Sequence, residues 1–589
     1  MELFGLPSGT VAGVEIRRAA ASPLDRIAAL ALPQLRRGQQ ANTNWGNSEH
    51  EQASVLAADT TMTNTGLSIM PACLQYFEPQ PGHISAHLTR RALGALIASS
   101  CVILLLVGCG SPASRTDPPL PTAGVVAPSS HPLVASYTVT SPSAGSVNVE
   151  FGTDVSYGRV TGSQAVSAGG SVTVLVAGMR PQTAYHMRAR VTLTNGTSLA
   201  DSDHTFTTGA VPQVTFPTVT VNPPGRSKSG GVDLISGTAD LISGTGPDVS
   251  AVVFDTDGSL LWYYYDPSLP KGAFAGPIKQ FDNGNFLINY GTDVREVDLQ
   301  GKIVRQVTFS QLNSSLTSAG YDLQVANIHH DLLRLDNGHW ILLVNEYRDF
   351  QNLPGYPGTT AVLGDALIDL DTNNQPVWVW RAFDHLDVNR HPYMFPDWTH
   401  SNGLVYEPDG SLLLSIRHQS WVLKIDYANG SGSGDVLWRL GPGGDFTLSS
   451  TDPAQWFYNQ HYPNLLSTSG STQKIALYDN GDTRPDSSGQ PCSQDCYSRG
   501  VIMNIDESAL TAQVSWQYSP GWFSFWGGSI VVLPNNNVEL DSTAPSGGYS
   551  KVVEVTQTST PQKVWEMDTS NTAFYRAYRI PSLYPGVSW

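Results

Sequence analysis

Apolar and polar residues alternate with a period of two between about residues 131 and 210. The runs 147–151 (VNVEF), 171–176 (SVTVLV) and 185–191 (YHMRARV) show this alternation clearly. A period of two places every second side chain on the same face, which is typical of β-strands with one buried face. The pattern therefore predicts several short strands in this part of the chain.

Turn-forming residues in the same stretch refine this prediction. The run 178–184 (GMRPQTA) is followed directly by Tyr185, at the start of a late strand. This arrangement resembles the tyrosine corner of fibronectin type III and immunoglobulin-like sandwiches. We therefore expect a small fibronectin III-like β-sandwich over residues 131–210, with no evident chemistry of its own.

A different pattern repeats beyond about residue 211. Each repeat has an apolar strand, an acidic or polar turn, and a second strand that usually contains Trp. Asn-Gly and Asp-Gly turns mark companion hairpins. This regular repeat predicts an all-β fold, a six-bladed β-propeller over residues 211–589, and disfavours an extended stack of sandwiches. The six instances, the second of which lacks Trp, are 253–262, 296–303, 368–378, 424–438, 504–516 and 553–565.

One strongly apolar segment, residues 92–108, lies near the front of the chain. Arg90 and Arg91 precede it, and Cys109 follows it directly. The basic start, short apolar run and small residue before the cysteine resemble a bacterial lipoprotein signal. We expect a signal peptide over residues 90–109 and a lipid-modified Cys109. A single transmembrane anchor is the alternative, but the segment is short for a bilayer core of about 30 Å.

The regions on either side of this segment carry little structural information. Residues 1–89 show no sustained periodicity, so we interpret them as disordered or as an overcalled start. Residues 110–130 are rich in Pro, Ser and Gly, which is typical of a linker. Together with the signal, this predicts a periplasmic or cell-envelope protein that meets the membrane only through a lipid anchor.

Composition and charge exclude some classes of function. Only 14% of the 589 residues are charged, and 55 are Gly and 39 Pro, which favours strands and turns over helical bundles. The net charge of −17 argues against nucleic acid as a partner. It does not exclude an anionic substrate, because local cations dominate the field inside a site.

The cysteines behind the signal indicate a disulfide. If Cys109 carries lipid, Cys492 and Cys496 form an even pair in an oxidising compartment. A metal site would need two more soft ligands nearby, and the sequence around the pair supplies none. We expect a local disulfide and no metal.

Three clusters that contain histidine sit at matching points of the repeat, at residues 328–331 (IHHD), 397–402 (DWTHSN) and 459–462 (NQHY). The innermost strands of a propeller face a common axis, so these clusters should converge there. Arg417 follows the second cluster. Alone, His400 or His461 would more often be a structural histidine, but together with Arg417 they predict a site for an anion.

Alternation along a strand limits which neighbours can take part. Of His329 and His330 only one should face the axis, and we favour His330. Of Arg417 and His418 only one should do so, and we favour Arg417.

Imidazole and guanidinium groups restrict the chemistry. Imidazole serves as nucleophile, acid or base near neutral pH, and Arg binds two oxygens of an anion with a planar fork. The sequence contains no nucleophile elbow, HExxH or Walker motif. This combination suits sulfuryl or phosphoryl transfer without a cofactor, since such transition states spread charge over three equatorial oxygens.

Four segments together resemble the bacterial arylsulfate sulfotransferases. They are 329–344, 397–446, 459–484 and 575–579, and the resemblance covers roughly residues 215–589. It implies a periplasmic six-bladed propeller that transfers a sulfuryl group from an aryl sulfate ester to a phenol, by a ping-pong mechanism through a sulfohistidine. A homodimer is a further expectation.

The resemblance also implies roles for particular residues. His461 would be the nucleophile, and His400 and Arg417 would bind sulfate oxygens with Asn402 beside them. One of His329 and His330 would supply a further contact, and one of these histidines would protonate the leaving phenoxide. Some family members keep a disulfide at a different place relative to the nucleophile, so the function of Cys492 and Cys496 is not implied.

Several aromatic residues stay open between stacking on an aryl donor and packing in the blades: Trp398, Trp456, Phe457, Tyr458, Trp522 and Trp526. Two other functions also stay open. One is a metal-dependent hydrolase that uses His329, His330, Asp331 and His400. The other is a non-catalytic propeller that binds a polymer or a partner at the cell surface.

Overall fold

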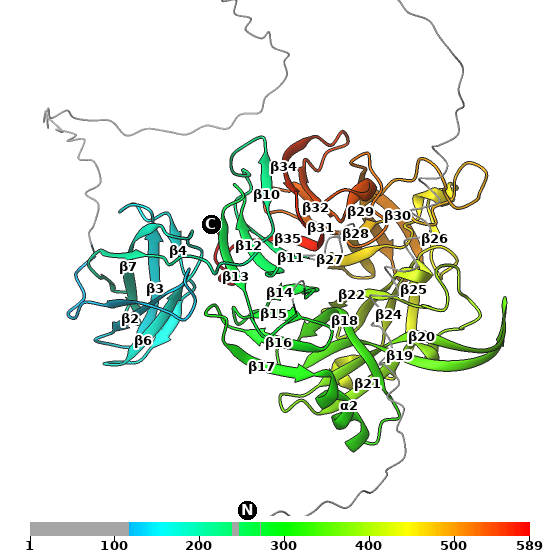
Figure 1. The fold of residues 1–589 in the computed structure, drawn as a ribbon, viewed down its shortest axis with the longest axis horizontal. Helices are drawn as coiled ribbons and strands as arrows, with labels where there is room; N and C mark the ends of the chain where they lie inside the picture. Colours follow the sequence, from blue (N-terminus) through cyan, green and yellow to red (C-terminus); the bar gives the residue numbers. More distant parts are fainter. Residues whose placement is uncertain (1–116, 238–246, 271–272) are drawn as a thin grey trace, which may run out of the picture. The chain divides into compact units, whose positions relative to one another are not determined.

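The computed structural model describes residues 117–237, 247–270 and 273–589, and nearly all of their regular structure is β-strand (Figure 1). The expected signal peptide 90–109 with Cys109, and residues 1–89, lie outside the described residues. Among the helices that are described, none is long and apolar enough to cross a membrane.

The first nine strands form two sheets. One has the order β1-β2-β6, and the other has the order β4-β3-β7-β8, with β5 and β9 pairing to β3 and β7. Burial alternates along β2 and β7 as the sequence pattern predicts, and the hydroxyl of Tyr185 accepts a hydrogen bond from the backbone N–H of Arg180 at 2.9 Å. Strand β1 falls within the range expected to be linker. The bounds are β1 Val125–Pro128, β2 Ala135–Thr140, β3 Gly145–Gly152, β4 Arg159–Val160, β5 Gln164–Val166, β6 Ser171–Val176, β7 Ala184–Leu193, β8 Ser198–Ala200 and β9 His204–Thr207.

From β10 onward, the described strands form six sheets of four or five strands. Neighbouring strands are antiparallel, except that β26 runs parallel to β30. The first three sheets in chain order are β35-β11-β12-β13, β14-β15-β16-β17 and β18-β19-β20-β21. Their bounds are β11 Val232–Gly237, β12 Ala251–Asp255, β13 Leu260–Tyr264, β14 Ile278–Gln280, β15 Phe286–Asn289, β16 Asp293–Val297, β17 Ile303–Thr308, β18 Val325–Arg334, β19 Trp340–Leu353, β20 Tyr356–Leu370, β21 Pro376–Arg381 and β35 Phe574–Ile580.

The other three sheets are β22-β23-β24-β25, β27-β28-β29-β30-β26 and β31-β32-β33-β34-β10. Their bounds are β10 Val219–Asn222, β22 Ser401–Tyr406, β23 Leu412–Ile416, β24 Trp421–Ile425, β25 Val436–Leu440, β26 Thr447–Leu448, β27 His461–Ser469, β28 Thr472–Asp479, β29 Arg499–Asp506, β30 Thr511–Tyr518, β31 Ser529–Val532, β32 Val538–Ser542, β33 Lys551–Val555 and β34 Lys563–Thr569.

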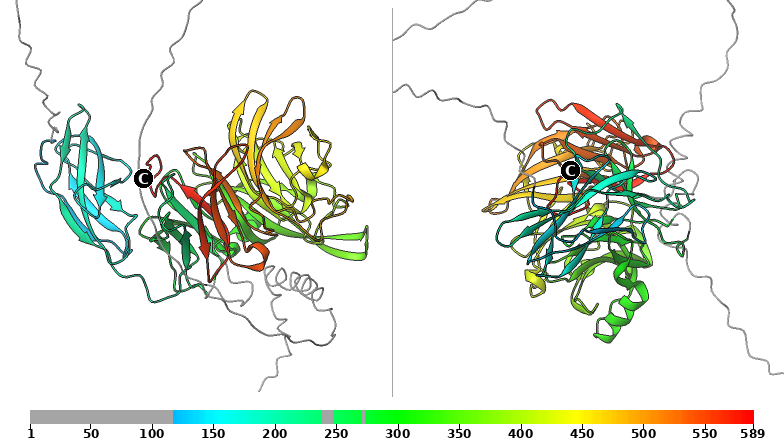
Figure 2. Two further views of the ribbon diagram at one scale, coloured as in Figure 1. Left: turned by 90° about the horizontal axis from the view of Figure 1, so that it is seen from above. Right: turned by 90° about the vertical axis from the view of Figure 1, so that its left-hand side faces the viewer.

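The six repeats seen in the sequence correspond to one place in these sheets. Each repeat is the third and fourth strand of its sheet, counted from β35, β14, β18, β22, β27 or β31. The Trp of each repeat lies on the fourth strand, while β17 carries none. The hairpin β19–β20 is long and reaches beyond its neighbours (Figures 1 and 2).

The first strands of the sheets lie near one another at the centre (Figure 1). Strand β22 contacts both β18 and β27, and β31 contacts both β27 and β35. The chain closes this arrangement twice, because β35 pairs with β11 of the first sheet and β10 pairs with β34 of the last sheet. Residues far apart in sequence therefore meet at the centre.

Arg579 on β35 holds this closure together. Its Nε lies 2.9 Å from Asp233 Oδ1, its Nη2 2.6 Å from Glu539 Oε2 and its Nη1 3.0 Å from Glu554 Oε2. All four side chains are buried, and they come from β35, β11, β32 and β33. One guanidinium thus links strands of the first and last sheets.

The described helices are short. Helix α2 (Phe309–Ser318) starts with a capping box, in which the side chains of Thr308 and Gln311 bond each other's backbone N–H groups. The others are α3 (Ala382–His385) and four 3-10 turns, η1 (Arg417–Gln419), η2 (Ala428–Gly430), η3 (Pro453–Gln455) and η4 (Pro545–Gly547).

Candidate functional site

Three central strands are bulged where their histidine clusters lie. The pairing of β18 with β19 shifts between Ile328 and Leu332, that of β22 with β23 between Ser401 and Gly403, and that of β27 with β28 between His461 and Asn464. A bulge leaves extra residues unpaired and redirects their side chains. His330 (φ 50°), within the β18 bulge, and His400 (φ 49°), directly before β22, adopt the left-handed conformation.

His461 is held in one tautomer. Its Nδ1 lies 2.7 Å from Asn480 Oδ1, and the Asn480 amide is oriented because its Nδ2 donates to the carbonyls of Ser524 and Gly527. The amide oxygen can only accept, so Nδ1 carries the proton. Nε2 is left with a lone pair, and the backbone N–H of Gly527 donates to it at 3.2 Å.

The surroundings of His461 also keep it neutral. The side chain is buried, and burial lowers its pKa well below the usual value, helped by the positive charges of Arg417 and Arg576. The hydrogen bond to Asn480 raises the pKa of His461, but it opposes the lowering only in part. A neutral imidazole whose Nε2 lone pair accepts only a 3.2 Å bond from the Gly527 N–H can act as a nucleophile when a substrate displaces that bond.

His330 and His400 face the same centre. Their rings lie 4.8 Å apart, and the His330 ring lies 5.5 Å from Tyr575. His329 points elsewhere, with Nε2 3.3 Å from Asp365 Oδ1, although its Nδ1 contacts His330 Nδ1 at 2.6 Å. Burial lowers the pKa of His330 well below its usual value, and the neighbouring histidines lower it further. The structure thus places His330, and not His329, beside His400.

His400 has a carboxylate partner, which the other two central histidines lack among the contacts described. Its Nδ1 lies 2.6 Å from Asp397 Oδ2. Burial opposes ionisation of Asp397, but the charges of His400, His418 and Arg417 hold the pKa of this carboxyl below its usual range. The carboxylate can only accept, so this contact places a proton on Nδ1 of His400 and fixes the direction of its ring.

Arg417 occupies the 3-10 turn η1 and is almost fully buried. Its Nη2 donates to the carbonyl of Phe525 at 2.5 Å and lies 3.1 Å from Asp482 Oδ2, while its Nη1 lies 2.9 Å from His418 Nε2. The expectation that Arg417 and His418 diverge is wrong, because the segment is a 3-10 turn and not a strand. Both side chains are buried within the same cluster.

Asn402 and Arg576 are linked to the segment that carries His461. Asn402 Nδ2 donates to the carbonyl of Gln460 at 2.7 Å, and Arg576 Nη2 donates to the carbonyl of Asn402 at 2.8 Å. Within the described residues, Asn402 Oδ1 and the Nε and Nη1 of Arg576 have no hydrogen-bond partner. Arg576 Nη1 is 3.6 Å from Asp331 Oδ2, and Asp331 also pairs with Lys279.

An aromatic cluster adjoins the histidines. The Tyr575 ring lies 6.1 Å from His461, 5.5 Å from Phe274 and 6.4 Å from Trp526, and it stacks on Trp526. Of the aromatic residues singled out in the sequence, Trp526 is the one that contacts this cluster. Trp398, Trp456, Phe457 and Tyr458 are buried in hydrophobic core.

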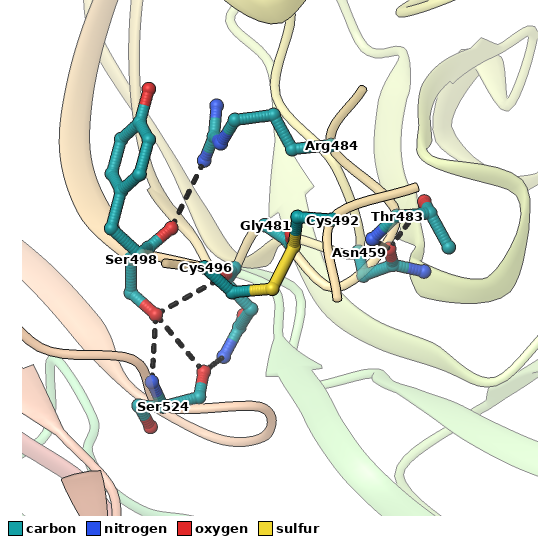
Figure 3. Close-up of a disulfide and its surroundings, with 10 residues drawn as sticks. Asn459, Gly481, Thr483, Arg484, Cys492, Cys496, Ser498 and Ser524 are labelled. Atoms are coloured by element: carbon teal, nitrogen blue, oxygen red, sulfur yellow. Dashed lines mark hydrogen bonds between the residues drawn. A yellow bond between two sulfur atoms is a disulfide. The ribbon is translucent and has the colours of Figure 1, made fainter. Parts of the chain in front are cut away.

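Cys492 and Cys496 form the expected disulfide, in the loop between β28 and β29 (Figure 3). The backbone N–H of Cys492 donates to the carbonyl of Arg484 at 2.9 Å. The same β28–β29 loop begins with Asn480, the partner of His461, but the ring that the disulfide closes spans only residues 492–496. Figure 3 shows Thr483 bonded to Asn459 on the neighbouring segment.

Sequence reasoning did not select five residues of this cluster: Asp397, His418, Asn480, Tyr575 and Arg576. Asp397 lies inside the DWTHSN run and Tyr575 and Arg576 inside the 575–579 segment, so the motifs contained a signal for them. Asn480 lies in the Asp-Asn-Gly turn after β28, which reads as an ordinary loop.

The described residues contain one group with spacing suited to a metal ion, Asp397, His400 and His418. It differs from the set His329, His330, Asp331 and His400 considered from the sequence. Both ring nitrogens of His418 are occupied, by the carbonyl of Asp397 at 2.6 Å and by Arg417. A third ligand is therefore missing unless these bonds break.

The family model for arylsulfotransferase (ASST) matches residues 241–579, more than half of the chain. The chain belongs to the arylsulfotransferase family. The matched range contains all the central histidines and both arginines, and the resemblance noted in the sequence is confirmed. Membership in the arylsulfotransferase family supports arylsulfotransferase activity in general terms.

Other comparisons add little. No curated protein matches the chain. A protein of unknown function from Bacteroides caccae is 11% identical, with a TM-score of 0.36, and the match covers 59% of this chain and 98% of that protein. A streptogramin B lyase structure is 8% identical, with a TM-score of 0.27, and the match covers 60% of this chain and 98% of the lyase chain. A duf4221 family member from Bacteroides vulgatus is 8% identical, with a TM-score of 0.27, and the match covers 62% of this chain and 99% of that protein. Values this low support no argument.

Proposed function

We propose that this protein is an arylsulfate sulfotransferase that moves a sulfuryl group from an aryl sulfate ester to a phenol, through a sulfohistidine at His461. The observation that carries the proposal is the fixed tautomer of His461. Its Nδ1 proton is held by Asn480, so Nε2 keeps a lone pair beside the cations of the site.

In the first half-reaction the Nε2 lone pair attacks sulfur. The N–S bond forms while the bond between sulfur and the aryl oxygen breaks, and the electron pair leaves on the phenoxide. The product is an Nε2-sulfo imidazolium that keeps its Nδ1 proton on Asn480 Oδ1. No base is needed to remove that proton, and the cationic ring remains a good leaving group.

His400 is the acid that protonates the phenoxide in this proposal. As the acid it would give its Nε2 proton to the phenoxide while its Nδ1–H stays on Asp397 Oδ2. In the second half-reaction neutral His400 takes the proton of the acceptor phenol. The phenol oxygen then forms its bond to sulfur, the N–S bond breaks, and His461 returns neutral.

Arg417, His330 and Asn402 would contact the sulfuryl oxygens. Charge on these oxygens is best stabilised by donors that are already oriented in a dry site. Arg417 is anchored on Phe525 and Asp482, and His330 lies against His400 and Tyr575. Tyr575 and Trp526 would provide an apolar wall for the aryl group.

The proposal includes the architecture and location expected from the sequence. The six sheets around a common centre would be the blades of a six-bladed propeller, and β1–β9 a fibronectin III-like sandwich. Residues 90–109 would direct export, with a lipid on Cys109 and a periplasmic or cell-envelope location. A homodimer is part of the same proposal.

The test uses an aryl sulfate donor with and without a phenol acceptor. We expect acceptor-dependent release of the donor phenol, and peptide mapping after mixing with donor alone should place a sulfuryl group on His461. His461→Gln should lose transfer by at least about a thousandfold. His391→Gln is the control and should stay active, because His391 is a half-buried loop histidine whose ring nitrogens lie near the carbonyls of Val388 and Pro354 and not at the central histidines.

Other outcomes would favour the alternatives. Stoichiometric bound metal whose removal abolishes turnover would favour a metal-dependent hydrolase. Tight binding of the donor without turnover, unchanged in His461→Gln, would favour a binding protein.

A further inference from the structure

His418 has both ring nitrogens committed to the chain. Nδ1 lies 2.6 Å from the carbonyl oxygen of Asp397, and Nε2 lies 2.9 Å from Nη1 of Arg417. A carbonyl can only accept and a guanidinium can only donate. His418 must therefore carry its proton on Nδ1 and present a lone pair from Nε2 to Arg417.

The ring of His418 also supports His400. The two rings stack with centroids 4.5 Å apart and an interplanar angle of 19°, and Tyr393 packs edge-on against His418 at 5.1 Å. His418 is 1% exposed, so these contacts leave it little freedom. One side chain thus touches two residues of the proposed reaction.

We propose that His418 is a positioning residue that acts as a neutral Nδ1–H imidazole, fixing the direction of the Arg417 guanidinium and the plane of the His400 ring. The kinetic part of this inference rests on the function proposed above. The tautomer does not depend on that function and is testable in the protein at rest.

The charges around His418 agree with a neutral ring. The groups that face it are Asp397, His400, Arg417 and Tyr393. Burial lowers the pKa of His418 to about 3, Asp397 opposes this shift, and His400 and Arg417 reinforce it. A proton on Nε2 would place an N–H against the guanidinium and break the bond that orients Arg417.

Nitrogen-15 NMR of the full chain, labelled at histidine, tests the tautomer. We expect one ring that stays neutral, with its proton on Nδ1, from about pH 8 down to about pH 5. An unperturbed histidine, with a pKa of about 6.5, would be mostly charged at pH 5. Contact with the Tyr393 ring and loss of the signal in His418→Gln assign it. An Nε2–H tautomer, or titration near the ordinary histidine pKa, would overturn the proposal.

Kinetics of three variants test the positioning role. His418→Gln retains an acceptor for Arg417, whereas His418→Asn is too short and His418→Phe keeps only the ring. We expect the Asn and Phe variants to lose about tenfold to a hundredfold in kcat/KM, because small misplacements of a binding group are costly. His418→Gln should recover part of this loss.

His385→Asn is the matched control. The His385 ring stacks on Trp380, with ring centroids 5.3 Å apart, and takes no part in the contacts of His418. Thermal melts show which variants fold. Wild-type rates in folded Asn and Phe variants, or a Gln variant worse than Asn, would overturn the positioning role. If wild-type protein transfers no sulfuryl group, the proposed function fails, and the NMR result still decides the tautomer.

Discussion

Arg576 and Arg579 lie three residues apart on β35, on opposite faces of the strand, and their environments differ sharply. Arg579 meets three buried carboxylates, from Asp233, Glu539 and Glu554. Arg576 is fully buried as well, but its acidic neighbour, Asp331, is 3.6 Å away and is shared with Lys279. Among the described residues, its Nε and Nη1 have no hydrogen-bond partner.

The difference separates a structural arginine from one available for an anion. Nε and Nη1 of Arg579 donate to Asp233 and Glu554, and its Nη2 forms an ion pair with Glu539, so this residue joins the first and last sheets and supports the fold. Leaving N–H groups of Arg576 unpaired costs free energy, because a buried donor loses its hydration. Such a cost is most readily offset when an anionic substrate supplies the missing acceptors.

Replacing Arg579 should give the largest effect of these predictions, a decrease in the free energy of unfolding. Arg579→Met leaves three buried carboxylates without their cation, and breaking buried pairs in this way costs about 3–5 kcal/mol. Urea unfolding measures the loss. The destabilisation should be smaller at pH 5 than at pH 8, because protonated carboxyls no longer repel. An unchanged unfolding midpoint would show that the cluster does not hold the closure.

Glu539→Gln is the matched control for this prediction. Burial raises the pKa of Glu539 well above its usual value. Gln also keeps the size of Glu and an oxygen near Arg579, so this change removes much less than loss of the cation does. The variant should unfold close to the wild-type midpoint.

Replacing Arg576 should instead affect turnover. Arg576→Met removes the unpaired N–H groups and a charge that keeps His461 neutral, and loss of one such donor typically costs about a hundredfold to a thousandfold in kcat. Asp331 keeps Lys279 as its partner, so the unfolding free energy should change less than in Arg579→Met. Steady-state kinetics and urea unfolding, measured on both arginine variants, compare the loss of turnover with the loss of stability. A variant that melts early but turns over normally would reverse our assignment of the two arginines.

The smallest expected effect concerns Asp482, which lies 3.1 Å from Arg417. Burial raises the pKa of Asp482 to about 7, although Arg417 opposes the shift. The folded pKa exceeds the unfolded one, so the stability from this group is present at low pH and is lost as pH rises through about 7.

Above pH 7 the charged carboxylate also competes with an anionic donor for Arg417. Asp482→Asn should remove both effects, with a change in kcat/KM at pH 8 of less than about tenfold, the equivalent of one pKa unit. Profiles of kcat/KM and of the unfolding midpoint from pH 5 to pH 9 test this. Parallel profiles for wild type and variant would contradict it.

The strands and the family could be predicted from the sequence, whereas the local geometry of the site was predicted less well. Amphipathic strands and tight turns are local signals, so they can be recognised from sequence alone. The Trp-containing strand of a repeat proved to be the fourth strand of its sheet. The family is confirmed because several separated motifs agree. His330, His400, Arg417 and His461 could also be selected, since each lies inside such a motif.

Other features depend on tertiary structure. Strict alternation would have separated Arg417 from His418, and only the turn η1 brings them together. The residues around His330 likewise give no sequence signal for the bulge in β18. Asn480 gains its role from the oxygen it presents to a residue on the neighbouring strand, and no pattern around it reveals this.

The pairing of β35 with β11 has a consequence for how the protein is made. Arg576 and Tyr575 come from one of the last strands to be synthesised, whereas Lys279 and His330 come from strands made much earlier. Contacts of such long sequence separation form late in folding. A nascent chain would therefore carry His461 for some time before it could react, and its chemistry would begin only when the closing strand has docked.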